Sequence, residues 1–588
     1  MPGVFGGNED APSASVLSSS TYRWDIHDEH RLSTDVPFGV IHHGERDPSG
    51  HTIVEDGSVS GIVYGVISNE DIDFTPDLVR RLLDAPGDVL PRLNGPFSLA
   101  CMDQLSGRTI IATDKMATRP LYYTVDDPFV FGSELSAVVQ AVDDPTLDEQ
   151  AASDILLMAH VWGDKTLVQE VKSLRPASYV RYENGEWEEH PYWQFSFGRY
   201  DGVDFVETFA QAYEGAVKDI ARTITGPTGL WLSGGLDSRM FAAALHTVDK
   251  PFRTFTYNRP LGTAEFGPFR TDLEIASDVS EALGVEHTVL SHTPDVIVNR
   301  IADLVDISDG LVGWNTMVNL SAVFDVKPNG MGVMCEGSGS AILCGEHVGS
   351  KRLSGMSYPG DVLYDMHALW DGGMVKNVLT GDVEPKDTFI DEVRASPYTD
   401  RNSRILGVTN MNYTPRKHFL SNKIARARFG TREQLPNNRL LELASQLPIE
   451  YRTQPFLYKG SPIPHVPSPM KLKLMRMLDR DGSLANIPYE GTQLPPSYPY
   501  AAHGVGFVAK NVVQRGLSSS DIGSWYRDND TFQRYIDGLL WSAGDRSLFD
   551  GDAIVDIRQE HMRKKADRLA FLAQVTTVEL FIQRILEQ

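Results

Sequence analysis

Residues 230–240, which read LWLSGGLDSRM, constrain the fold of this chain more than any other stretch. A short apolar run leads into Ser233-Gly234-Gly235, and the residues after Ser238 are apolar and helix-forming. This order predicts a buried strand, a sharp turn and the start of a helix. Two adjacent glycines let the backbone approach an anion closely, and a helix start offers unpaired N–H groups and a positive dipole end. The segment therefore predicts an anion-binding turn, with an ordinary strand–turn–helix junction as the alternative.

The side chains of this turn favour the phosphates of a nucleotide. Ser233 and Ser238 add hydroxyl donors, and Asp237 supplies a hard oxygen ligand of the kind that a phosphate-bound Mg2+ prefers. The turn is no Walker A loop, because the lysine that follows the last glycine of that loop is missing here. It resembles the pyrophosphate-binding loop (PP-loop) of enzymes that split ATP into AMP and pyrophosphate. The expected ATP-binding residues of the turn are Leu232, Ser233, Gly234, Gly235, Asp237 and Ser238.

Length and composition set the class of protein. A chain of 588 residues exceeds what one hydrophobic core holds, so two or more domains are expected. A hydrophobic content of 41% is typical of a globular protein. We find no run of about 18 apolar residues and no signal-peptide pattern, and we therefore predict a soluble cytoplasmic protein with no membrane partner. Three cysteines without a CxxC pair exclude a disulfide framework.

The formal net charge of −25 bears on the partners of the chain. Nucleic acid is not an expected partner, because binding to phosphate backbones needs basic patches. A solvated acidic surface, which favours solubility, is the simplest interpretation. Acidic composition, in which Arg outnumbers Lys about two to one, also suggests the acidic proteome of a salt-rich cytoplasm.

The pattern of elements divides the chain in two. The first ~150 residues favour short strands separated by turn residues. From Phe205 onward strands and helices alternate, which predicts a parallel sheet with its ligand at the carboxyl ends of the strands. The last ~70 residues favour helices. The expected strands are 61–67, 97–102, 109–113, 121–125, 129–132, 252–257 and 287–290, and the expected helices are 76–83, 147–159, 209–220 and 273–283. Residues 554–572 and 575–586 are expected to be mostly helical.

Three segments besides SGGLDS carry a family resemblance. They are LNGPFSL at residues 93–99, the segment 114–123 that ends in RPLYY, and FGSEL at residues 131–135. In this order they resemble the LNGxFAF, RDxxGxxPLYY and FASEL motifs of the asparagine synthetase family. That family includes lasso-peptide macrolactam synthetases and β-lactam synthetases. The resemblance covers most of the chain.

The resemblance implies an α/β fold with two domains. Residues 1–200 would form a glutaminase-like domain of the class II glutamine amidotransferase type, an αββα sandwich as in N-terminal nucleophile (Ntn) hydrolases. Residues 201–588 would form an ATP-pyrophosphatase synthetase domain, adenine nucleotide α-hydrolase-like, with a parallel sheet and a helical C-terminal part.

The first domain departs from the family at two places. Glutamine-dependent members expose a nucleophilic cysteine as their second residue, and this chain has Pro2, which cannot attack a carboxamide. The Asn-Gly-Glu segment that holds glutamine reads Tyr64-Gly65-Val66 here. Both departures predict a domain that is retained as structure without glutaminase activity.

The second domain has a further nucleotide segment. EGSGSAILCGE at residues 336–346 resembles the family's SGEGSDEIFGG. The resemblance places Gly337 and Ser338 at the nucleotide, but the acidic residue that helps to hold Mg2+ falls at Ala341 and the acidic or tyrosine residue near the reacting centre falls at Ser338. Glu336, two residues before Ser338, could partly compensate. A plain glycine-rich turn is the alternative.

Four other positions resemble family features. Tyr257 would lie at the adenine, and Asp272 matches an Asp that opens the second nucleotide-side helix, although by itself it is an N-cap. Residues 432–443 resemble RVPFLDxxLLEL, with Asn437 in place of Asp. Residues 470–476 resemble the GKxKxxLR helix, whose lysine balances negative charge on the reacting phosphorus. Lys471 and Lys473 are both candidates for that catalytic lysine, and a charged helix face is the alternative.

The implied reaction uses ATP and Mg2+ to activate a carboxylate, of a small molecule or a peptide, as an acyl-adenylate. Ammonia or an amine then captures the acyl group. Asp237 would be the metal ligand and, with Lys471 or Lys473, a catalytic residue. Three functions stay open: an amide ligase that uses free ammonia or a substrate amine, a lasso-peptide-type macrolactam synthetase, and a nucleotide-binding pseudoenzyme. The identity of both substrates and the oligomeric state, for which a homodimer is one option, are left open.

Overall fold

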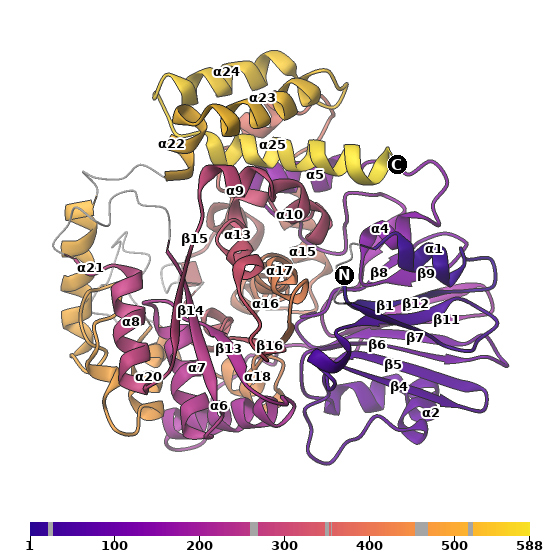
Figure 1. Cartoon of the computed structure of the whole chain (residues 1–588), viewed down its shortest axis with the longest axis horizontal. Helices are drawn as coiled ribbons and strands as arrows, with labels where there is room; N and C mark the ends of the chain where they lie inside the picture. Colours follow the sequence, from indigo (N-terminus) through magenta and orange to yellow (C-terminus); the bar gives the residue numbers. More distant parts are fainter. Residues whose placement is uncertain are drawn as a thin grey trace.

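The computed structural model describes residues 1–21, 27–258, 269–346, 348, 352–353, 355–452, 468–514 and 521–587. Its described part is built on two six-stranded sheets and one five-stranded sheet. The two six-stranded sheets lie face to face at one side of the molecule, and helices α22–α25 cover one end of the rest (Figure 1).

The N-terminal part is an αββα sandwich, as expected. One sheet has the strand order β10-β8-β9-β1-β3-β2 and the other β12-β11-β7-β6-β5-β4. Helices α1 and α4 pack on the first sheet, and α2 packs on the second. The bounds are β1 (Gly3–Gly7), β2 (Asp28–Arg31), β3 (Phe38–His42), β4 (His51–Asp56), β5 (Val59–Gly65), β6 (Phe97–Asp103), β7 (Thr109–Thr113), β8 (Tyr122–Thr124), β9 (Val130–Gly132), β10 (Val171–Ser173), β11 (Ser178–Glu183), β12 (Glu186–Pro191), α1 (Ala14–Ser19), α2 (Pro76–Asp84), α3 (Pro86–Val89), α4 (Leu135–Val139), α5 (Glu149–Met158), and the short η1 (Gly44–Arg46) and η2 (Leu90–Arg92).

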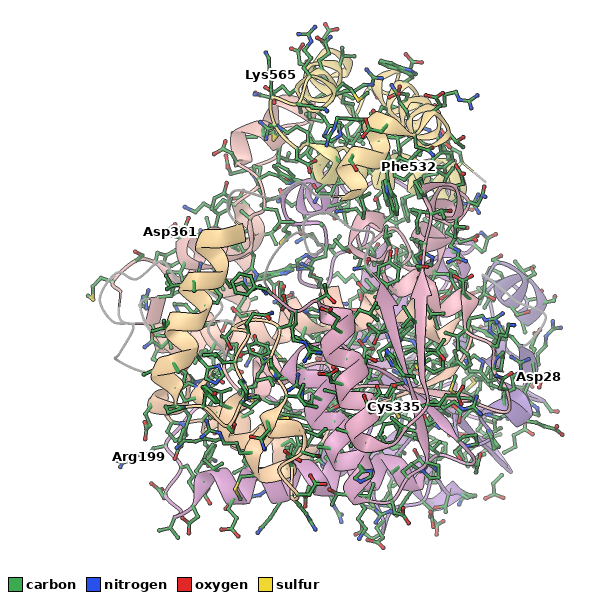
Figure 2. All side chains as sticks on the ribbon, turned by 60° about the vertical axis from the view of Figure 1, so that its left-hand side comes forward. Asp28, Arg199, Cys335, Asp361, Phe532 and Lys565 are labelled. Atoms are coloured by element: carbon green, nitrogen blue, oxygen red, sulfur yellow. The ribbon has the colours of Figure 1, made fainter. Side chains whose placement is uncertain are left out.

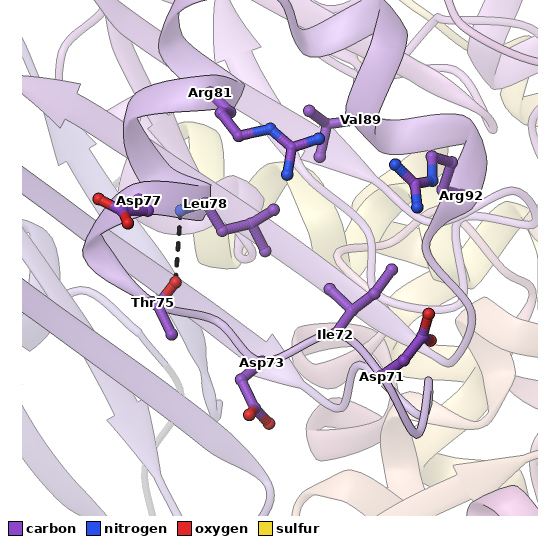
Figure 3. Close-up of a pocket in the computed structure, with 9 residues that line it drawn as sticks. All are labelled: Asp71, Ile72, Asp73, Thr75, Asp77, Leu78, Arg81, Val89 and Arg92. Atoms are coloured by element: carbon purple, nitrogen blue, oxygen red, sulfur yellow. Dashed lines mark hydrogen bonds between the residues drawn. The ribbon is translucent and has the colours of Figure 1, made fainter.

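Alternation along the central strands explains the layers. In β5 and β6 the side chains of Ile62 and Ala100 pack between the sheets, whereas those of Val63 and Leu99 pack under α2. Successive residues of a strand point to opposite faces, so strands that are apolar on both faces become buried on both. Helix α2 starts at Pro76, and the Thr75 hydroxyl accepts the Leu78 N–H (Figure 3).

The second part is built on a parallel sheet in the order β15-β14-β13-β16-β17. The chain runs outward from β13 to β15 and returns to β16 on the other side, so the strand order reverses between β13 and β16. Ligands of open parallel sheets bind outside the carboxyl ends of the strands at such a reversal. Cys335 of β16 lies among the packed side chains of this sheet (Figure 2). The strands are β13 (Thr228–Trp231), β14 (Phe252–Asn258), β15 (His287–Ser291), β16 (Val333–Glu336) and β17 (Gly430–Glu433).

Helices complete this part. Helices α6, α7 and α20 pack against one another, and α5 of the N-terminal part packs on α25. The described helices are α6 (Phe205–Arg222), α7 (Leu236–Thr247), α8 (Asp272–Leu283), α9 (Pro294–Val298), α10 (Ile301–Ile307), α11 (Ser340–Leu343), α13 (Pro359–His367), α14 (Gly372–Val378), α15 (Asp387–Ala395), α16 (Arg401–Tyr413), α17 (Lys423–Arg426), α18 (Asn438–Ser445), α19 (Ile449–Arg452), α20 (Pro469–Leu478), α21 (Tyr500–Gln514), α22 (Asp521–Asp528), α23 (Asp530–Gly544), α24 (Gly551–Met562), α25 (Leu569–Phe581), the 3-10 turns η4 (Trp314–Thr316), η5 (Leu320–Asp325) and η8 (Leu484–Asn486), and the π-helical η6 (Thr414–Phe419) and η9 (Ile582–Leu586).

The expected strands and helices are confirmed with end shifts. Residues 554–572, expected to be mostly helical, are so, with a break where α24 ends at Met562 and the chain turns before α25. Lys564 takes a positive φ of 58°, and the buried His561 Nδ1 accepts the Arg568 N–H at 3.1 Å. Strands β1–β4, β10–β12, β16 and β17 were not foreseen. Residues 569–586 are apolar and long enough to cross a membrane, but 72% of that stretch is buried inside the fold, as in the core helix of a globular protein.

Buried ion pairs join the two parts. Arg119 Nη1 lies 3.2 Å from Glu433 Oε2, and Arg432 Nη2 lies 2.6 Å from Asp47 Oδ1. A third pair joins Lys423 to Glu134, and the side chains of all six residues are at most 4% exposed. These contacts fix the sandwich to the carboxyl end of β17 and to α17. The domain division expected at residues 200/201 falls just before α6 and stays a prediction.

Candidate nucleotide site

The SGGLDS turn connects β13 to α7 at the strand reversal. Its hydroxyl groups stabilise the turn itself: Ser238 Oγ accepts the Ser233 N–H at 3.1 Å, and Ser233 Oγ accepts the Gly235 N–H at 3.2 Å. Gly235 is the N-cap of α7 and no side chain caps the helix start. The first-turn N–H groups of α7 are therefore the donors that the turn offers to an anion.

Asp272 holds the remaining glycine N–H of the turn. Its Oδ1 accepts from Gly234 N at 2.9 Å. The N-cap of α8 is instead Thr271, which forms a capping box with Glu274, so the interpretation of Asp272 as an N-cap is wrong. Thr271 caps the helix, and Asp272 bonds to the turn.

A segment from the C-terminal half covers the turn. Gly234 O accepts the Glu490 N–H at 3.1 Å. The fully buried Arg239 of α7 donates to Ile487 O at 2.8 Å and to Pro488 O at 2.9 Å. Sequence reasoning missed Arg239, although an arginine in the first turn of an otherwise apolar helix was a visible signal.

Lys471 meets the turn from α20. Its Nζ lies 2.6 Å from Asp237 Oδ1 and also contacts the Glu346 carboxylate. The Lys471 side chain is 8% exposed. Burial alone would lower the pKa of Lys471, but Asp237 and Glu346 outweigh it and hold the pKa well above its ordinary value. Lys471 is therefore a fixed positive charge between two carboxylates.

Lys473, the other candidate, lies elsewhere. It is exposed, with Nζ 4.6 Å from the centre of the Tyr451 ring. Residues two apart on a helix point about 200° apart, so only one of the two lysines can face the turn. The structure brings Lys471 to Asp237 and leaves Lys473 at the surface.

The glycine-rich segment after β16 packs directly on the start of α7. A Cβ on Gly337 would lie 3.0 Å from Asp237 O and 3.1 Å from Ser238 Cα. Ser338 follows it, and Tyr257 lies near the carboxyl end of the neighbouring strand β14 with its ring 5.0 Å from that of His292. Gly337, Ser338 and Tyr257 thus lie at the expected edge of the sheet.

Glu346, which sequence reasoning passed over, provides the second carboxylate at this site. Its Oε1 accepts the Ser468 N–H at 3.0 Å, and Ser468 caps α20 by accepting the Lys471 N–H. Glu336, the expected compensating acid, lies instead among Glu433, Arg426 and Arg119 at the joint of the two parts. Burial, and then the neighbouring Glu433, raise the pKa of Glu336 to about 8.

The carboxylates of this site fit a metal ion that binds together with a nucleotide phosphate. Within the described ranges no group of three or more His, Cys, Asp or Glu side chains could hold a metal ion. Asp237 and Glu346 converge on Lys471 beside the turn. Mg2+ in nucleotide sites is held by one or two carboxylates together with water and phosphate oxygens, which these two residues could satisfy.

Another hollow has no part in this arrangement. It lies beside α2, has a volume of about 320 Å³ and is lined by Asp71, Ile72, Asp73, Thr75, Asp77, Leu78, Arg81, Val89 and Arg92 (Figure 3). All of these residues belong to the N-terminal sandwich. Their mixed charges suit a solvated surface.

Comparison with known proteins agrees with the architecture. The family model "Asparagine synthase" matches residues 208–460, and the model "Glutamine amidotransferase domain" matches residues 77–193. The chain belongs to the asparagine synthetase family. The two models match the two structural parts in the order in which the sequence arranges them.

Individual members of the family are distant in sequence. "Asparagine synthetase [glutamine-hydrolyzing] 1" of Bacillus subtilis is 24% identical over 41% of this chain and 38% of its own length. "Amidase chry2" of Gibberella zeae is 23% identical over 43% of this chain and 40% of its own length. The chain thus spans two fifths or less of the curated relatives it matches.

One solved structure with a partial likeness is glutamine phosphoribosylpyrophosphate amidotransferase from B. subtilis complexed with ADP and GMP. It is 13% identical, with 49% of this chain and 65% of that chain covered and a TM-score of 0.22. At that score the likeness supports no conclusion about this chain.

Proposed function

We propose that this protein is an ATP-dependent carbon–nitrogen ligase that forms an acyl-adenylate and passes the acyl group to ammonia or an amine, without hydrolysing glutamine. The contact of Lys471 with Asp237 and Glu346 beside the SGGLDS turn supports this most. A protonated lysine at a phosphate-binding turn suits a reaction in which negative charge builds on phosphorus. The family match of the second part agrees with it.

In the proposed reaction a carboxylate oxygen attacks the α-phosphorus of ATP and the bond to the bridging oxygen breaks, so pyrophosphate leaves. The nitrogen then attacks the acyl carbon, loses a proton, and AMP leaves. The N–H groups at the start of α7 would bind pyrophosphate. Lys471 keeps its proton because its pKa is held high, so it stabilises charge and does not act as the base.

Asp237 and Glu346 would hold Mg2+, which when bound neutralises charge on the leaving pyrophosphate. Glu346 supplies a carboxylate where the family's acidic position is Ala341. The pseudoenzyme alternative rests on the departures at Ala341 and Ser338, and the presence of Glu346 weighs against the first of them.

The first domain supports a nitrogen source other than glutamine. Pro2, Tyr64 and Val66 are buried. The nearby LNG segment is held by the second domain: Asn94 Oδ1 accepts the Asn438 N–H at 2.9 Å, and the Gly95 N–H donates to Pro436 O at 2.8 Å. A macrolactam synthetase, in which the amine belongs to the same peptide as the acid, stays the alternative.

Exchange of labelled pyrophosphate into ATP, measured over a panel of small and peptide carboxylic acids, tests the proposal. We expect exchange that depends on the acid, and AMP and amide formation once ammonia or an amine is added. Glutamine should give neither amide nor glutamate. ATP binding without exchange for any acid would identify a pseudoenzyme, and a cyclised peptide product would identify the macrolactam alternative.

A further inference from the structure

A cavity lies where the N-terminal sandwich meets helices α15 and α16 of the second part. Its volume is about 380 Å³, which is within the range of small-molecule sites. On one side it is lined by β11, β12 and the segments next to them, and on the other by α15, α16 and the segment between these helices. None of the residues described at the nucleotide turn lines it. The cavity is therefore separate from the candidate nucleotide site.

The walls of this cavity are mainly apolar. Trp193 comes from the sandwich side, and Tyr398, Val408 and Met411 come from the helical side. The Tyr398 ring lies directly on the backbone of α16, because a Cβ on Gly407 would overlap it. Trp193 and Tyr398 are both half-buried. Two aromatic side chains from different elements suit a flat apolar body between them.

One polar group in the lining is a closed network. Arg175 Nη1 donates to Glu392 Oε2 at 3.1 Å, and Arg175 Nη2 donates to Glu392 Oε1 at 2.9 Å. Asn412 Nδ2 also donates to Glu392 Oε2 at 2.9 Å, while Asn412 Oδ1 accepts the Gly163 N–H at 2.8 Å. This bidentate pair joins the sandwich to α15, and its two charges satisfy each other.

Glu189 of β12 is a lining carboxylate without a cation. Its Oε2 accepts the Tyr123 hydroxyl at 2.7 Å, and the Glu189 side chain makes no ion pair within the residues that the structure describes. Burial raises the pKa of the Glu189 carboxyl, although the Tyr123 hydroxyl and the charge of Arg175 oppose this. Carboxylates that leave water are normally paired, so Glu189 offers the cavity a negative charge that a bound cation would neutralise.

We propose that this cavity binds a small molecule with a flat apolar body and one ammonium group. The body would lie between Trp193 and Tyr398, and the ammonium would pair with Glu189. Aromatic rings also attract cations, so the walls and the carboxylate favour the same charge. A ligand anion would instead have to compete with Glu392 for Arg175. This site does not depend on the proposed function, because it needs neither ATP nor the nucleotide turn.

The test uses three indoles that share one ring and differ at the end of the side chain: tryptamine, indole-3-ethanol and indole-3-propionic acid. Binding to the full chain is measured by calorimetry, with and without a non-hydrolysable ATP analogue. We expect tryptamine to bind about ten-fold or more tightly than the neutral indole-3-ethanol, the effect of one charged hydrogen bond, and the anion to bind most weakly. The ATP analogue should not displace tryptamine.

Two pairs of variants locate the ligand. Glu189→Gln, whose amide oxygen still accepts the Tyr123 hydroxyl, should make tryptamine and indole-3-ethanol bind equally. Glu188→Gln is its matched control, because Glu188 is the adjacent residue of β12, is 74% exposed and points to the opposite face. Met411→Trp should fill the cavity and weaken all three indoles, whereas Met356→Trp, at an exposed position, should not.

Four results would overturn the proposal. They are absence of tryptamine binding by wild type, displacement of tryptamine by the ATP analogue, an unchanged tryptamine preference in Glu189→Gln, and equal binding by wild type and folded Met411→Trp. Tighter binding of indole-3-propionic acid than of tryptamine would refute the assigned charge, because it would make Arg175 the group that holds the ligand. Melting curves verify folding, and the Glu189→Gln comparison decides the proposal even if Met411→Trp does not fold.

Discussion

Among single residues, Lys471 carries the largest share of the candidate site. Its ammonium lies between Asp237 and Glu346, which otherwise repel each other, beside the SGGLDS turn. Removing it takes away the transition-state charge and also leaves two carboxylates unpaired. This substitution should lower the reaction rate more than the stability of the fold, because the Asp237 and Glu346 side chains are partly open to solvent.

We predict that Lys471→Met lowers kcat for pyrophosphate formation by about a hundred-fold or more, the scale for removing one charge-stabilising donor. Lys473→Met, on the same helix but on its exposed face, is the control and should stay within about two-fold. Steady-state kinetics of both variants measure kcat, and melting curves verify that both are folded. A larger loss of kcat in Lys473→Met than in Lys471→Met would mean that Lys473, and not Lys471, stabilises the charge.

A second prediction concerns the metal. Glu346→Gln should raise the Mg2+ concentration needed for half-maximal pyrophosphate release, since a neutral amide is a weaker ligand for a hard cation than a carboxylate. Glu336→Gln is the comparison, because Glu336 lies at the joint and should not change the Mg2+ titration. Mn2+ binding followed by electron paramagnetic resonance with a non-hydrolysable ATP analogue gives a readout without turnover. Identical titrations for wild type and Glu346→Gln would remove Glu346 from the metal site.

At the scale of elements, the site depends on how closely the segment after β16 approaches the start of α7. They follow the neighbouring parallel strands β16 and β13, whose carboxyl ends meet at the strand reversal. Gly337 permits this approach because the atoms that a Cβ would meet belong to the Asp237 and Ser238 backbone and to Phe241 Cβ. None of these atoms can rotate away.

Gly337→Ala should therefore push the two elements apart and weaken ATP binding, with a loss of stability of about 1–3 kcal/mol from overpacking. The matched control is Gly87→Ala in α3, where an added Cβ meets nothing within 4 Å. That control should be neutral or slightly stabilising. Urea unfolding and calorimetric titration with an ATP analogue measure both effects. Unimpaired ATP binding by Gly337→Ala would mean that the segment does not shape the turn.

At the scale of the whole molecule, the sandwich is held to the parallel sheet by charges that are almost completely buried. Breaking such pairs by removing one partner is costly, because the other charge stays buried without compensation. Glu336 differs from the other acids of this joint. It faces Glu433 across the strands, and its raised pKa shows that the charged form is disfavoured there.

This gives a pH-dependent prediction. The folded pKa of Glu336 is about 8 against an ordinary value of 4.5, so the folded state holds a proton that the unfolded state has lost between those values. Stability contributed by this proton is full at low pH and declines as pH rises toward 8. Glu336→Gln keeps the neutral form, and we expect it to stabilise the protein by about 1–2 kcal/mol near pH 9 and by little near pH 5. Equal gains in unfolding free energy at both values would show that Glu336 is ionised in the fold.

The sequence alone determined the anion-binding turn, the two-part architecture and the family, because these depend on residues adjacent in the chain. Ser233–Ser238 needs only a strand, two glycines and a helix start, and the alternation of strands and helices predicts the parallel sheet. Only the tertiary structure selected Lys471 over Lys473, replaced Glu336 with Glu346, and turned Asp272 toward Gly234. Each of these choices depends on which face of an element meets another element distant in sequence. Local propensity does not fix that face, because it follows from how whole elements pack.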